Sequence, residues 1–229
     1  MGWKLSLIRV EDIGLGCAVS LVVGLFFWPR GASAAMGKAL AEAYEESSAY
    51  LKAAVTFAAG RCSASAAGPS TPVAEAGQAA AAARRLDDAF RSYLAERGAK
   101  PVPLAEMTTL VTGVVGLRLA ADAVLALWER AGAERRADRT AARGELLAGA
   151  EGVSQWFAAL AASLEGDRPA PEPLPHDDAA ERRLAETVRQ DLETRGGENT
   201  AAAVRVIWTG DHLDAARRLQ PALAAAART

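Results

Sequence analysis

Apolar residues recur along most of the chain at the three- and four-residue spacing of amphipathic helices. Three clear stripes are Met36, Leu40, Tyr44, Ser47, Leu51, Val55 and Ala58; Val73, Ala76, Ala80, Ala83, Leu86 and Phe90; and Leu146, Ala150, Val153, Phe157, Leu160 and Leu164. Two later stripes are Leu184, Val188 and Leu192, then Val204, Ile207, Trp208, Leu213 and Leu219, the last running out near Pro221. No such stripe is typical of a β-strand, so the pattern predicts helices throughout.

Breaks in the periodicity divide the chain into parts. Short connections between amphipathic helices favour an antiparallel bundle, which we place over residues 32–164. The proline-rich stretch EGDRPAPEPLPHDD predicts an extended linker or loop over 165–178. Residues 179–229 are expected to form C-terminal helices that pack on the bundle.

The stretch from Leu104 to Glu129 is the most apolar part of the bundle, and by length it resembles a membrane span. Arg118 and Asp122 interrupt it at i, i+4 spacing, where the two side chains share a helical face. A charged pair is costly in lipid. We therefore predict a central bundle helix whose polar face is closed by a structural salt bridge between Arg118 and Asp122.

The run Ile13–Trp28 has 16 residues and no charge. As a helix it covers about 24 Å, close to a hydrocarbon core of roughly 30 Å once flanking side chains reach the interfaces. Gly16, Ser20 and Gly24 lie on one face, in the small-xxx-small spacing through which membrane helices pack. The favoured interpretation is a transmembrane helix that contacts other transmembrane helices.

Two other interpretations of this run stay open. Ala32-Ser33-Ala34 fits the small-x-small cleavage pattern of a secretory signal peptide. A buried helix of a soluble domain has the same length and composition.

Composition supports helices and excludes several functions. The chain has 55 Ala in 229 residues and only 6% aromatic residues, which favours helix over sheet. A net charge of −2 lacks the basic surface of a nucleic-acid-binding protein. Cys17 and Cys62 have no Cys or His at ligand spacing, so neither a disulfide framework nor a zinc site is predicted.

Catalytic chemistry has few candidates in this sequence. His176 stands beside Asp177 and Asp178 in the proline-rich stretch, but local spacing supplies no third metal ligand, and His212 follows Asp211 on the last helix. No nucleophile or phosphate-binding motif occurs. We expect no enzyme activity, no metal and no cofactor.

The N-terminal segment carries a family resemblance. Arg9, Asp12 and Gly16 precede or open the apolar run, and Pro29 closes it. This arrangement resembles the last membrane helix of the fusaric acid resistance protein-like family of aromatic acid exporter-like integral membrane transporters. The resemblance implies that residues 1–31 are the last transmembrane helix of a transporter and that this chain corresponds to its C-terminal portion.

The same resemblance implies partners and a location. Arg9 and Asp12 would lie at the membrane boundary and contact small organic anions, although an interfacial salt bridge between them is the alternative. Other transmembrane helices, from a chain of the same family or from further copies, would complete the transport path, because one helix encloses none. The helical domain would lie in the cytoplasm at the plasma membrane. The alternative function is a single-pass anchored or secreted scaffold without catalytic activity.

Overall fold

The computed structural model of the chain describes residues 32–62, 69–96, 102–129, 140–166, 168–194 and 200–228. These residues form six helices and no strand: α2 (Ala32–Arg61), α3 (Val73–Ala95), α4 (Leu104–Glu129), α5 (Thr140–Glu165), α6 (Asp178–Thr194) and α7 (Thr200–Ala226). The expected all-α class is confirmed for this part of the chain. The predicted membrane helix, with Arg9, Asp12, Gly16, Ser20 and Gly24, lies outside the described residues.

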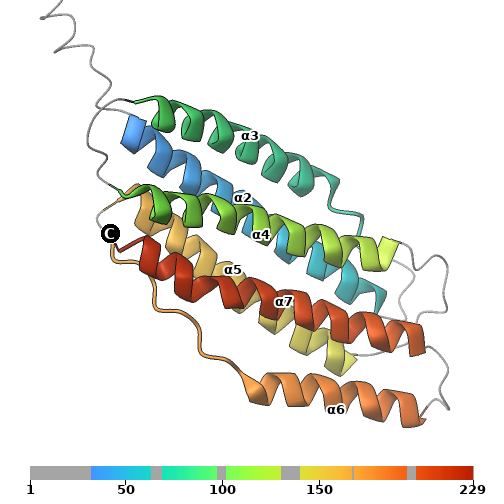
Figure 1. Ribbon diagram of the computed structural model, residues 1–229. Helices are drawn as coiled ribbons and strands as arrows, with labels where there is room; N and C mark the ends of the chain where they lie inside the picture. The colour runs from blue at the N-terminus through green and yellow to red at the C-terminus, as the bar shows by residue number, and fades with distance from the viewer. Residues whose placement is uncertain are drawn as a thin grey trace, which may run out of the picture.

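Helix α2 forms the centre of the bundle and packs against α3, α4 and α5 (Figure 1). All seven positions of its predicted stripe are buried, as are several alanines on its other faces, including Ala41 and Ala59. Alanine favours helix and adds little width. Neighbouring helices can therefore approach α2 from three sides.

Contacts far apart in sequence fix the register of the helices. Tyr44 of α2 stacks on Phe157 of α5, and Lys52 forms an ion pair with Glu151, so the two helices run in opposite directions. Tyr44 also bonds to Leu110 of α4, and Tyr50, further along α2, reaches further along α4 as well, so α2 and α4 run in the same direction. Figure 1 shows α7 beside α4 and α5, and α6 at the edge of the assembly.

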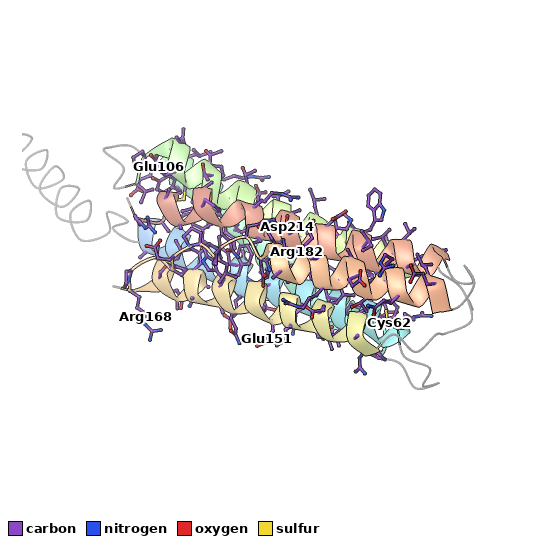
Figure 2. The ribbon with its side chains drawn as sticks, turned by 90° about the horizontal axis from the view of Figure 1, so that it is seen from below. Cys62, Glu106, Glu151, Arg168, Arg182 and Asp214 are labelled. Atoms are coloured by element: carbon purple, nitrogen blue, oxygen red, sulfur yellow. The ribbon has the colours of Figure 1, made fainter. Side chains whose placement is uncertain are left out.

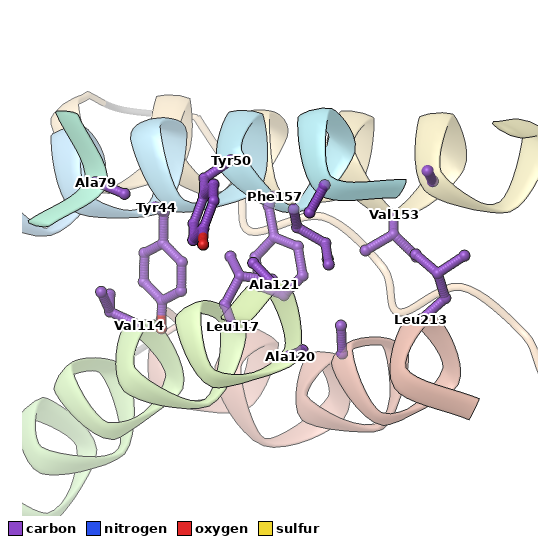
Figure 3. Close-up of a cluster of buried hydrophobic side chains, with 14 of the residues drawn as sticks. Tyr44, Tyr50, Ala79, Val114, Leu117, Ala120, Ala121, Val153, Phe157 and Leu213 are labelled. Carbon is purple, nitrogen blue, oxygen red and sulfur yellow. The ribbon is translucent and has the colours of Figure 1, made fainter. Parts of the chain in front are cut away.

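The core is built around Tyr44 and Phe157, whose ring centroids lie 5.7 Å apart (Figure 3). The Tyr44 hydroxyl donates a hydrogen bond of 2.6 Å to the carbonyl oxygen of Leu110, which satisfies a fully buried polar group. Burial raises the pKa of Tyr44 far above its ordinary range. At Gly113, a Cβ atom would lie 2.4 Å from the Tyr44 hydroxyl, so only glycine lets α4 approach this closely.

Helix α7 differs from the sequence expectation in two ways. It continues through Pro221 to Ala226, because Leu223, Ala224 and Ala226 are buried against the core and their packing outweighs the lost backbone bond. Its buried face includes Ala203, Val206, Thr209, Leu213, Ala216, Gln220 and Leu223. The predicted stripe was therefore partly wrong: Val204 and Trp208 are about half exposed.

The proline-rich segment 168–177 has no regular secondary structure and joins α5 to α6. Two side chains of the bundle hold its backbone. Trp156 Nε1 donates a hydrogen bond of 2.8 Å to the carbonyl oxygen of Glu172, and the Leu174 amide donates one of 2.9 Å to Oε1 of the buried Gln220. The segment is thus anchored to both α5 and α7.

Candidate functional site

Arg118 and Asp122 lie on α4, but Asp122 has a different partner from the predicted one. Its Oδ1 accepts a hydrogen bond of 2.7 Å from the Tyr50 hydroxyl, which joins α4 to α2. Desolvation and this bond to a carboxylate raise the pKa of Tyr50. Within the described residues no ion pair links Arg118 to Asp122, and Nε of Arg118 is buried without a hydrogen-bond partner. The cross-helix Tyr50 contact takes the place that the sequence assigned to an intrahelical salt bridge.

Helix α4 is also the one helix among those described that is long and apolar enough to cross a membrane. One of its faces, including Leu110, Val114 and Leu117, is buried in the core. On the outer face Val115 is 51% and Leu119 is 61% exposed. The helix therefore contributes to the bundle core and also exposes two large apolar side chains, between the exposed Thr112 and Asp122.

A hollow with a volume of about 200 Å³ lies between α5, α6 and α7. Its apolar wall includes Leu146 of α5, Leu184 of α6, and Ile207 and Leu213 of α7. Its rim is charged and includes His176, Glu181, Asp214 and Arg217. We call this hollow the α5–α6–α7 pocket.

At the rim, His176 brings three carboxylates together. Its Nε2 lies 3.0 Å from Oδ1 of Asp178 and 3.5 Å from Oε2 of Glu181. Its Nδ1 lies 3.5 Å from Oδ1 of Asp214, which stands near the middle of α7 (Figure 2). His176, Asp178 and Glu181 offer ligand atoms within 4.8 Å of one another, as a metal ion requires. We call these three residues the His176 triad.

The start of α6 sets the spacing of the triad. Asp177 precedes the helix, and its Oδ1 accepts a hydrogen bond of 2.8 Å from the Ala180 amide, which caps the first turn. This bond lowers the pKa of Asp177 and commits its carboxylate to the backbone. Asp178 and Glu181 are then three residues apart on one helical face.

Sequence reasoning identified His176 and its acidic neighbours but expected no third ligand. Glu181 does lie at i+3 from Asp178, so a helix beginning at Asp178 would have revealed it. Asp214 comes from another helix, and no spacing rule places it beside His176. The other histidine, His212, lies near Trp208, with ring centroids 6.4 Å apart, and takes no part in the triad.

The charges around the triad are unevenly compensated. Asp214 is paired with Arg218 and lies 3.6 Å from Arg217 Nη1. Glu145, on the other side of the pocket, is paired with Arg183 at 2.9 Å. Among the described residues, by contrast, no arginine or lysine pairs with Asp178 or Glu181. Two exposed carboxylates therefore lie beside His176 without an arginine or lysine partner in the described part of the chain.

No protein-family model, curated protein or solved structure matches the chain.

Proposed function

We propose that this chain is the C-terminal part of a membrane efflux transporter similar to the fusaric acid resistance protein-like family. In this proposal residues 13–28 form a transmembrane helix, and the helical bundle stands in the cytoplasm at the plasma membrane. The observation that carries the proposal is the uncharged 16-residue run, which only three residues separate from the start of α2. Such a short connection would hold the bundle directly against the bilayer.

The described residues offer one point of support. The outer face of α4 exposes two large apolar side chains, Val115 and Leu119, which suit contact with a lipid surface or with another membrane helix.

In the proposed transporter, the chain acts together with other transmembrane helices. Gly16, Ser20 and Gly24 provide the packing face, and Arg9 and Asp12 lie at the membrane boundary, where Arg9 attracts small organic anions and Asp12 positions it. The bundle assembles or regulates the complex.

Membrane association and co-assembly can be tested together. The full chain is expressed in a bacterial host and recovered in carbonate-washed membranes, and chemical crosslinking in these membranes detects association with other membrane chains or copies. Replacing Gly16 and Gly24 by Leu is expected to abolish the crosslinks while leaving bundle unfolding unchanged. Ala18→Leu, which enlarges a small residue on the opposite side of the predicted helix, is the matched control.

Two outcomes would contradict the proposal. A mature chain beginning at Ala35 by N-terminal sequencing would establish a secreted bundle, the alternative function. Full release of the intact chain by carbonate would show that residues 13–28 do not span the bilayer.

A further inference from the structure

We propose that the His176 triad binds a divalent first-row transition-metal ion, with Zn²⁺ as the representative ion. The inference concerns the α6 side of the bundle and is independent of membrane transport. It rests on the geometry of the triad, on its uncompensated charge and on the pocket beside it.

The distances in the triad fit a shared metal ion. Bonds of 2.0–2.2 Å at tetrahedral or octahedral angles put neighbouring ligand atoms about 2.9–3.5 Å apart. His176 Nε2 lies 3.0 Å from the nearer Asp178 oxygen and 3.5 Å from the nearer Glu181 oxygen. Small rotations of three exposed side chains would therefore bring all three atoms around one ion.

The second nitrogen of His176 also has the environment of a metal ligand. A histidine that binds metal through one nitrogen commonly donates the N–H of the other to a carboxylate, which fixes the ring. Asp214 occupies this place at 3.5 Å from Nδ1, and its own charge is balanced by Arg217 and Arg218. Asp214 is thus a positioning residue rather than a fourth ligand.

The negative charges of Asp178 and Glu181 favour the binding of a cation at the His176 triad. Asp178 and Glu181 bring like charges within 4.8 Å, and a divalent ion would relieve their repulsion. A nitrogen ligand beside two carboxylates suits Zn²⁺ and related ions, whereas Mg²⁺ and Ca²⁺ prefer oxygen ligands alone.

The α5–α6–α7 pocket leaves space for a further ligand of the ion. His176 and Glu181 belong to its rim, so an ion held by the triad faces the pocket opening. Arg217 also lines this pocket, and its guanidinium lies 3.6 Å from Asp214, the carboxylate on the other side of His176.

Binding would have a structural effect. His176 belongs to the segment before α6, whereas Asp178 and Glu181 belong to the first turn of α6. The ion would therefore tie this segment to the helix and, through Asp214, orient both against α7. We expect Zn²⁺ to raise the temperature at which α6 unfolds.

The test uses the full chain, purified in detergent and treated with a chelator. Isothermal titration with Zn²⁺ near neutral pH is expected to give one site per chain. His176→Ala should weaken binding at least about tenfold through loss of a ligand, and Asp214→Asn about tenfold through loss of ring orientation. His212→Ala, which removes the other histidine, is the matched control and should bind like the unchanged chain.

A second variant and a second measurement distinguish the loss of a metal ligand from a general loss of folding. Glu181→Gln keeps the shape of a 70% exposed side chain, removes one anionic ligand and should also weaken binding. Co²⁺ should give a visible absorption band with the unchanged chain and with His212→Ala, but not with His176→Ala. Equal Zn²⁺ affinity in the unchanged chain and His176→Ala would overturn the proposal, as would displacement of Zn²⁺ by millimolar Mg²⁺.

Discussion

Helices α2 and α6 are held in the molecule by different forces. Helix α2 is enclosed by α3, α4 and α5 and buries apolar side chains on most of its faces. Among the α6 side chains that the structure describes, Val188 alone is buried; Leu184 and Leu192 pack partly buried against the core, and Arg183 pairs with Glu145 of α5. Extensive apolar burial therefore stabilises the centre, while a narrow apolar stripe and polar contacts that respond to pH, salt and ions hold the edge.

The sharpest test of this difference is a pair of truncations. Phe157 is fully buried between Tyr44 and Trp156, so Phe157→Ala should lower the free energy of unfolding by about 3–5 kcal/mol. Leu184→Ala, in the partly buried contact of α6 with α7, should cost only about 1 kcal/mol. Urea unfolding followed by circular dichroism measures both. Equal losses of unfolding free energy in the two variants would contradict the proposed difference between the centre and the edge of the bundle.

Substitutions of a buried and an exposed tryptophan should differ in their effect on stability, by less than the pair of truncations above. Trp128 is buried, and its Nε1 donates a hydrogen bond of 2.9 Å to Thr209 Oγ1, which joins α4 to α7. Trp128→Phe leaves the threonine oxygen without this donor and should cost about 1–3 kcal/mol. Trp208 lies on α7, and its side chain is 52% exposed. Trp208→Phe should therefore change the free energy of unfolding by no more than about 0.5 kcal/mol. A larger effect at Trp208 in the same unfolding assay would indicate that this residue packs against something outside the described bundle.

Low pH should destabilise α6 and the segment before it sooner than it destabilises α2. Hydrogen bonds from Arg189 and Gln190 lower the pKa of Glu186 from 4.5 to about 2, and the Ala180 amide lowers the pKa of Asp177. Both groups stabilise the folded state above their unfolded pKa of about 4, and this contribution is lost as the pH falls through the folded values. Pepsin should then cleave first within 168–194, as mass spectrometry of the fragments would show. First cuts within α2 would contradict the expectation.

The smallest effect is expected for a surface ion pair of α6. Arg183 contacts Glu145 of α5 with two hydrogen bonds, but its side chain is 54% exposed. Arg183→Met should therefore reduce the free energy of unfolding only slightly, and by less at high salt, because the pair is screened by solvent and ions. Arg182→Met, at the neighbouring exposed position labelled in Figure 2, is the control for charge and length. Urea unfolding at two salt concentrations measures the difference, and a loss independent of salt would argue against an electrostatic contact.

The sequence predicted the helices better than their faces. Large side chains at regular spacing identified the buried stripe of α2 correctly, because Leu40, Tyr44 and Leu51 can only be placed inward together. In α7, alanines cover more than one face, so the stripe through Val204 and Trp208 looked as suitable as the one that is buried. Packing against α4 and α5 decided between them, and no local pattern contains that information.

In the candidate site, too, the sequence pattern identified neighbours within one segment but not the contacts between helices. His176 and Asp178 were visible as neighbours in sequence, and the helix that begins at Asp178 adds Glu181. Asp214 reaches them only because α7 lies beside α6. The Tyr50 contact with Asp122 likewise joins two helices and had no signal in the spacing that suggested Arg118 as the partner.

The central place of α2 has a consequence for synthesis on the ribosome. Its long-range partners are Leu110 of α4 and Phe157 of α5, which are translated much later than Tyr44. At about 5–20 residues per second, α2 waits on the order of 5–20 seconds before α5 can cover it. During that time α3 shields one side, while the faces that will meet α4 and α5 remain open to chaperones and to other chains. The best-protected helix of the finished protein is thus among the segments most exposed while the protein is being made.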